Sequence, residues 1–199
     1  MTRAIIIATG PSLMAEDIHT AICSDRQIYA VNNAYTYLMR ADVLYACDCE
    51  WWNLHHKLSL NYFINERWTT NDEAAKKYGL NHVPGEHWEQ RRIPFDVSGH
   101  GIVYGGNSGF QALNLAYIKG IRDAILLGFD MGHEKNESKH CHGEHPSGID
   151  RPSPFAEWIR SFERAAPVIA AAGMQVRNAT RRTRLTCFPQ VDLREAVGG

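Results

Sequence analysis

The sequence predicts an α/β fold, with a doubly wound, mostly parallel Rossmann-like sheet in a single domain over residues 1–199. Two observations lead to this prediction. Short β-branched apolar runs alternate with segments of helical periodicity, which is typical of parallel strands joined by helical crossovers. Most of these runs are also continuously apolar, as expected for strands buried on both faces. An irregular insertion around residues 61–100 interrupts the alternation.

The expected strands end in small or polar residues. In chain order they are residues 3–9, 27–31, 42–47, 62–65, 101–103, 122–127 and 174–178. The expected helices are residues 14–22, 51–58, 72–78, 108–119 and 154–172. The fourth helix should bury one apolar stripe, formed by most of Phe110, Leu113, Leu115, Ala116 and Ile118. The last contains Pro167, which is expected to kink it, and should end at Gly173.

Composition excludes several classes of function. The net charge of -1 argues against a general affinity for nucleic acid. The five cysteines show no CxxC spacing, so we expect reduced thiols rather than a disulfide framework. No apolar run approaches the roughly 20 residues that span a membrane. We therefore expect a soluble, cytoplasmic protein. The sequence leaves open whether it forms a homo-oligomer.

Two glycine-bearing turns, TGPS at residues 9–12 and YGGNSG at residues 104–109, each lead from a strand into a helix. Helix N-termini offer free N–H groups to a phosphate, and glycine lets a ligand approach the backbone. The candidate nucleotide-binding residues in these turns are Gly10, Pro11, Ser12, Gly106, Asn107 and Ser108. Alternatively, Gly-Gly only makes a tight turn and Asn107 or Ser108 caps the helix. Neither turn is a GxGxxG fingerprint or a P-loop, which disfavours hydride transfer and P-loop kinase chemistry.

Polar residues follow the other expected strands. Asp48 and Asp130 stand where a carboxylate can hold Mg²⁺ against phosphates or contact a ribose hydroxyl, and Asp48 is a catalytic candidate. Helix capping is the alternative. Asn32 and Asn33 could hydrogen-bond a base or a sugar, or form an Asx turn.

A histidine-rich loop, KHCHGEHPSG at residues 139–148, contains His140, His142 and His145. Histidine titrates near neutrality, so His142 and His145 are candidate catalytic acids or bases on a loop that can cover the site. A metal site and a solvated loop without a role are the alternatives.

A cluster of arginines and a pair of tryptophans each allow two interpretations. The sequence VRNATRRTRL brings together Arg177, Arg181, Arg182 and Arg184, which suit phosphate or carboxylate recognition or form a solvated face. Trp51 and Trp52 follow Asp48, where core packing is favoured over stacking on a base.

Several of these segments together resemble a known superfamily. The strand running into GPSL, the strand running into VNN, and GGNSGFQALNLAYIKGIRDAILLGFDM are similar to Rossmann-like archaeal-type 6-hydroxymethylpterin pyrophosphokinases and flagellin-glycosylation proteins, and more distantly to bacterial lipooligosaccharide sialyltransferases. Short members with this pattern occur in phages and prophages. The resemblance implies that residues 10–12, Asn107 and Ser108 line a nucleotide site faced by Asp48 and Asp130. It covers residues 3–33 and 101–131 well, residues 174–190 loosely, and the middle of the chain not at all.

Three functions follow as expectations. The first is a nucleotide-dependent group transferase, glycosyltransferase-like, whose donor is a sugar nucleotide. The second is an ATP-dependent pyrophosphokinase-like enzyme, which would need Mg²⁺ to neutralise phosphate charge. The third is a non-catalytic nucleotide-binding phage accessory protein.

Overall fold

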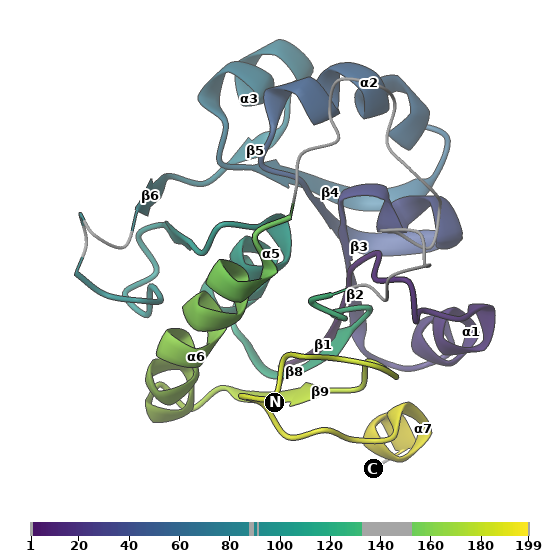
Figure 1. Cartoon of the computed structure of the whole chain (residues 1–199). Coiled ribbons are helices and arrows are strands. Elements are labelled where there is room, and N and C mark those ends of the chain that lie inside the picture. Colours follow the sequence, from purple (N-terminus) through teal and green to yellow (C-terminus); the bar gives the residue numbers. More distant parts are fainter. Residues whose placement is uncertain (1, 88–89, 91, 133–152, 199) are drawn as a thin grey trace.

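A computed structural model of the chain describes residues 2–87, 90, 92–132 and 153–198. Its centre is a seven-stranded sheet with the order β5-β4-β3-β2-β1-β8-β9, in which every pair is parallel (Figure 1). The strands are β1 (Thr2–Ile7), β2 (Gln27–Val31), β3 (Arg40–Tyr45), β4 (Phe63–Thr69), β5 (Asn81–His82), β8 (Ile121–Leu127) and β9 (Gln175–Asn178). This confirms the predicted α/β class.

Helices cover both faces of the sheet, because the residues of each strand alternate between two apolar clusters. In β1, Ala4 and Ile6 belong to one cluster and Ile5 and Ile7 to the other. The first cluster is closed by α5 (Ser108–Ile118) and α6 (Phe155–Ala171). The second is closed by α1 (Ala15–Ile22), the 3₁₀ helix η1 (Asn32–Tyr37), α2 (Cys49–Ser59), α3 (Asp72–Tyr78) and α7 (Leu193–Gly198). Figure 1 shows α5 and α6 on the opposite side of the sheet from α1.

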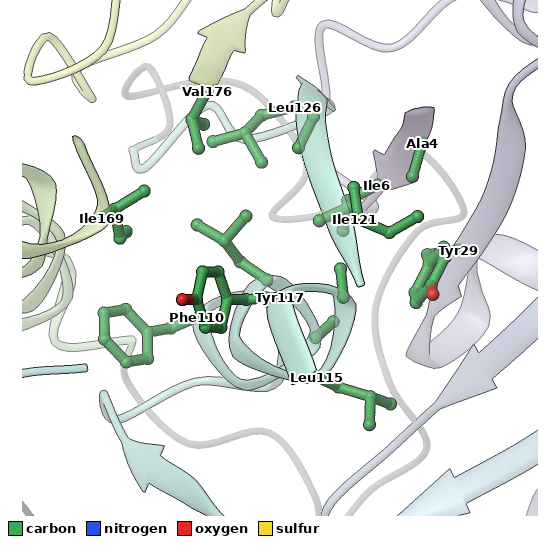
Figure 2. Packing of buried hydrophobic residues seen from close by; sticks show 14 of the residues in the cluster. Ala4, Ile6, Tyr29, Phe110, Leu115, Tyr117, Ile121, Leu126, Ile169 and Val176 are labelled. Atoms are coloured by element: carbon green, nitrogen blue, oxygen red, sulfur yellow. The ribbon is translucent and has the colours of Figure 1, made fainter. Parts of the chain in front are cut away.

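Helix α5 is buried on all sides, so its burial extends beyond the one apolar stripe predicted from the sequence. Every residue from 108 to 117 is buried. Figure 2 shows Phe110 and Tyr117 on the side of α5 that faces Ile169 of α6, whereas Leu115 projects from another side of the helix. The reason is tertiary: the sheet packs on one side of α5, and α6 and the segment around Phe95 pack on the others.

The segment 61–100 is regular at its start and irregular later. Strand β4, helix α3 and edge strand β5 continue the parallel sheet. Beyond them, β6 (Gly85–His87) pairs with β7 (Ile102–Tyr104) in a separate two-stranded ribbon. The strand expected at residues 101–103 therefore forms, but outside the central sheet.

Asn114, a fully buried residue of α5, ties this ribbon to the core. Its carbonyl oxygen accepts hydrogen bonds from Asp96 N at 3.2 Å and Val103 N at 3.1 Å, and its amide donates to Asp96 O at 2.8 Å. A buried polar side chain is stable only when its groups are paired in this way.

Helix α6 (Phe155–Ala171) and strand β9 (Gln175–Asn178) agree with the prediction within one residue at each end. Helix α6 continues through Pro167, and Gly173, with φ of 76°, follows its C-terminal residues. Helix α7 was not expected from the sequence. None of the described helices is long and apolar enough to cross a membrane.

Candidate functional site

The carboxyl ends of β1, β2 and β8 and the N-terminus of α5 enclose a cavity of about 130 Å³. It lies at the topological switch point, because the chain winds from β1 to β2 along one face of the sheet and connects to β8 along the other. Six of the candidate residues line this switch-point cavity, namely Gly10, Pro11, Asn32, Asn107, Ser108 and Asp130. The two glycine-bearing turns therefore meet at one edge of the sheet.

The first turn does not present bare amides, which corrects the expectation for residues 9–12. The N–H of Gly10 donates to Gly128 O at 2.9 Å, and the N–H of Ser12 donates to Asp130 Oδ2 at 2.9 Å. Pro11 has no N–H group. A Cβ on Gly10 would lie 1.9 Å from Asp130 Oδ1, so the glycine is needed to admit this carboxylate. An internal carboxylate thus occupies the place that we expected a phosphate to take.

Two acceptor oxygens of the cavity lining lack a donor. Asp130 Oδ1 and Asn32 Oδ1 are buried and have no hydrogen-bond partner among the described residues. Asn32 also has a left-handed backbone, with φ of 49°. Burial raises the pKa of Asp130, and the hydrogen bonds from Ser12 and the charge of Arg182 offset this only in part. Unpaired buried oxygens are rare in proteins, and these two call for a hydroxyl, an amine or a cation.

The second turn does present free amides. Asn107 caps α5, because its Oδ1 accepts from Phe110 N at 2.8 Å. The capping alternative is therefore confirmed for this residue. The N–H groups of Ser108 and Gly109 have no acceptor within the described ranges. Together with the helix dipole, they favour an anion in the cavity.

Packing explains the glycines of YGGNSG better than ligand approach does. A Cβ on Gly105 would lie 2.2 Å from the ring of Phe110, and one on Gly109 would lie 2.7 Å from Phe129. Gly106 has φ of 83°, a conformation that favours glycine. Each glycine meets a constraint of the fold itself.

Asp48 lies on the same edge of the sheet but outside the cavity lining. It is exposed at the start of α2, without a side-chain bond to the helix N–H groups. Its neighbour Cys47 has its sulfur 3.2 Å from Ser108 Oγ. Burial raises the pKa of Cys47 to about 12, so this thiol stays protonated and is no nucleophile.

The candidate Asn33 has its side chain committed to structure. Its Oδ1 accepts from Trp51 Nε1 at 2.7 Å, and Trp51 stacks on His55 with ring centroids 4.4 Å apart. Trp52 is fully buried and donates to Ala46 O at 3.0 Å. Both tryptophans are core residues, as favoured from the sequence.

The arginine cluster divides in two. Arg177 forms an ion pair with Asp123 at 2.8 Å, and Arg181 pairs with Asp17 at 2.8 Å, so both stabilise the fold. The Arg184 N–H donates to the carbonyl oxygen of Asp130 at 2.9 Å, which brings this exposed residue beside the cavity.

The candidates His140, His142 and His145 lie outside the described residues. Within the described part of the chain, no three His, Cys, Asp or Glu side chains gather as metal ligands. Ser12 and Gly106 do not line the switch-point cavity, although both belong to the turns that form it.

Sequence reasoning missed the aromatic walls of the cavity, Phe129, Phe155 and Trp158. The sequence FDM directly after the expected strand 122–127, and PFAEW at the start of the next helix, were the only signals that could have placed them. Comparison of the chain with family models, curated proteins and solved structures finds no match.

Proposed function

We propose that the protein is a nucleotide-dependent group transferase that binds its donor, a sugar nucleotide, at the switch-point cavity. One observation carries this proposal: acceptor oxygens and donor amides that have no partner among the described residues line the same small cavity. A ligand that satisfies both kinds of group has hydroxyls at one end and an anion at the other. A ribose phosphate has this pattern.

The side chains suggest how such a ligand would be held. Asp130 Oδ1 and Asn32 Oδ1 would accept hydrogen bonds from ribose hydroxyls. The amides of Ser108 and Gly109, at the positive end of α5, would hold a phosphate. Ligand pockets usually measure about 300–1,000 Å³, so this smaller cavity would hold only the ribose phosphate of the nucleotide.

The same groups would assist transfer. When the donor bond breaks, negative charge builds up on the leaving phosphate, and amides already aimed at it stabilise that charge. His142, His145 and Asp48 remain the proposed acids or bases for the acceptor hydroxyl. The resemblance to glycosylation-related Rossmann-like proteins agrees with this chemistry. The pyrophosphokinase alternative would need Mg²⁺, which Asp130 could bind only together with phosphate oxygens.

Calorimetric titration with CMP-, UDP- and GDP-sugars, ATP and NAD tests the proposal. We expect the unmodified protein to bind one sugar-nucleotide class. Asp130→Asn should weaken binding about 10- to 150-fold, the equivalent of a hydrogen bond to a charged group at roughly 1.5–3 kcal/mol. The variant should fold. Because the pKa of Asp130 is raised in the folded protein, ionisation of its carboxyl lowers the stability as the pH rises, and an asparagine removes this cost.

Asp25→Asn is the matched control, since Asp25 is an exposed carboxylate at the opposite edge of the sheet, paired with Arg3. It should bind like the unmodified protein. Failure of every nucleotide to bind, or equal binding by Asp130→Asn, would overturn the proposal. Preference for ATP with loss of binding in EDTA would favour the pyrophosphokinase. Binding without turnover would favour the non-catalytic protein.

A further inference from the structure

A second groove, of about 570 Å³, lies between the β6–β7 ribbon and α6. Its chemistry combines aromatic faces with positive charge. The side chains that supply this chemistry are His87, Tyr104, Trp158, Arg160, Arg164 and Glu157. None of the functions expected from the sequence used this groove, here called the ribbon groove.

The α6 side of the ribbon groove supplies the charge. Glu157, Arg160 and Arg164 are spaced three, four and seven residues apart, which places them on one face of the helix. Arg160 and Arg164 are the basic residues of this face, and Glu157 is the acidic one. Arg160 is exposed, and its Nε donates to Ala156 O at 3.1 Å. Its terminal nitrogens have no acceptor in the described part of the chain and can bind a carboxylate or phosphate.

The ribbon side supplies flat apolar surfaces. Tyr104 and His87 meet edge to face, with ring centroids 5.1 Å apart. A Cβ on Gly85 would lie 2.4 Å from the Tyr104 ring, so this ring lies directly over the glycine backbone. Rings held in this way can pack against the C–H face of a sugar.

The ribbon groove is next to the switch-point cavity, because Trp158 lines both. The turn at Gly106 connects them as well: a Cβ there would lie 2.9 Å from Trp158 Cδ1. Gly106 lines the ribbon groove, and the next residue, Asn107, lines the cavity. A molecule in the groove would thus lie beside a donor in the cavity.

We propose that the ribbon groove binds the acceptor of the transfer reaction, and that this acceptor is an acidic sugar bearing a carboxylate or a phosphate. The role as acceptor rests on the proposed function, whereas binding of the acidic sugar does not. In the reaction, a hydroxyl oxygen of the acceptor forms a bond to the anomeric carbon of the donor. The bond from that carbon to the phosphate oxygen breaks, the nucleotide leaves with the electron pair, and the hydroxyl proton passes to a base.

Calorimetric titration with a glucuronic acid oligosaccharide, glucose 6-phosphate and a neutral glucose oligosaccharide tests the proposal. At least one acidic probe should bind ten times more tightly than the neutral one, and the two acidic probes distinguish a carboxylate from a phosphate. In the double variant Arg160→Ala/Arg164→Ala, acidic-sugar affinity should fall at least tenfold. The double control Arg40→Ala/Arg194→Ala removes two exposed arginines that lie outside the groove, and it should change nothing.

The outcomes separate the two proposals. Equal binding of neutral and acidic sugars, or unchanged binding by Arg160→Ala/Arg164→Ala with native circular dichroism, would overturn the groove proposal. So would binding of a nucleotide without binding of any acidic probe, although the proposed function would then stand. Binding of an acidic probe that depends on the arginines, without binding of any nucleotide, would support the groove and refute the transferase.

Discussion

Replacement of Gly105 by alanine probes why the YGGNSG turn is rich in glycine. The new Cβ would lie 2.2, 2.3 and 2.7 Å from three atoms of the Phe110 ring, about 0.8 to 1.3 Å inside an ordinary contact distance of about 3.5 Å. Phe110 cannot move away freely. It is fully buried, and its ring centroid lies 5.1 Å from that of Phe162 and 6.0 Å from that of Phe95.

The expected magnitude follows from this confinement. Overpacking of a core typically costs about 1–3 kcal/mol, and the backbone cannot yield without moving the start of α5, so we expect the upper end, about 3 kcal/mol. The assay is equilibrium urea unfolding monitored by circular dichroism. Gly120→Ala is the control: it also changes a glycine near α5, but its Cβ would meet nothing within 4 Å. Its φ of 88° alone should cost about 1 kcal/mol.

A double-mutant cycle tests the mechanism directly. Phe110→Leu removes ring atoms from the position of the clash, so it should recover at least about 1 kcal/mol of the loss caused by Gly105→Ala. A loss by Gly105→Ala no larger than that of Gly120→Ala, or additive effects of Gly105→Ala and Phe110→Leu, would refute the packing explanation. The ligand explanation of this glycine would then regain its place.

Three further predictions concern the frame of the site. Asn114→Ala removes the partner of three buried backbone groups, so urea unfolding should show a loss of about 3–5 kcal/mol; a loss under about 1 kcal/mol would contradict the role of this residue as a tie. Asn107→Ala removes the α5 cap and should cost about 1 kcal/mol in thermal unfolding. Burial alone would raise the pKa of Asp123, but hydrogen bonds from Arg177 and Arg26 hold it below the ordinary value of 3.8. The ionised Asp123 therefore stabilises the fold above about pH 3.8, and this stabilisation is lost as the pH falls through the lowered pKa. In Asp123→Asn, the free energy of unfolding should accordingly depend less on pH below about 4.

Much of the fold could be predicted from the sequence because strand burial and helix periodicity are local signals. Strand 27–31 and helix 72–78 have the predicted bounds, and the other expected strands and helices agree within a few residues except β4. The exception is instructive. Strand β4 contains Asn65, Glu66 and Arg67, and such polar residues interrupt the apolar pattern from which a strand is predicted. This strand forms because it pairs with β3, which lies elsewhere in the chain.

The site could be predicted in outline only. Polar strand ends indicated the correct edge of the sheet, because parallel strands place their carboxyl ends together. The sequence could not show that Asp130 accepts a hydrogen bond from the Ser12 N–H or that Asn33 accepts one from Trp51. Each of these bonds joins residues from different elements of the chain. Nor could it show that Arg177 and Arg181 are used in ion pairs.

By itself, the sequence determined the order of the main strands and helices, without β5, β6 and α7, and the edge at which their polar ends meet. It offered the capping of α5 by Asn107 or Ser108 as one of two alternatives. These follow from side-chain polarity and from bonds between near neighbours. Only the tertiary structure decided which polar groups stay unpaired there. A hydrogen bond between distant residues depends on how the chain packs, and packing leaves Asp130 Oδ1, Asn32 Oδ1 and the amides of Ser108 and Gly109 without partners among the described residues.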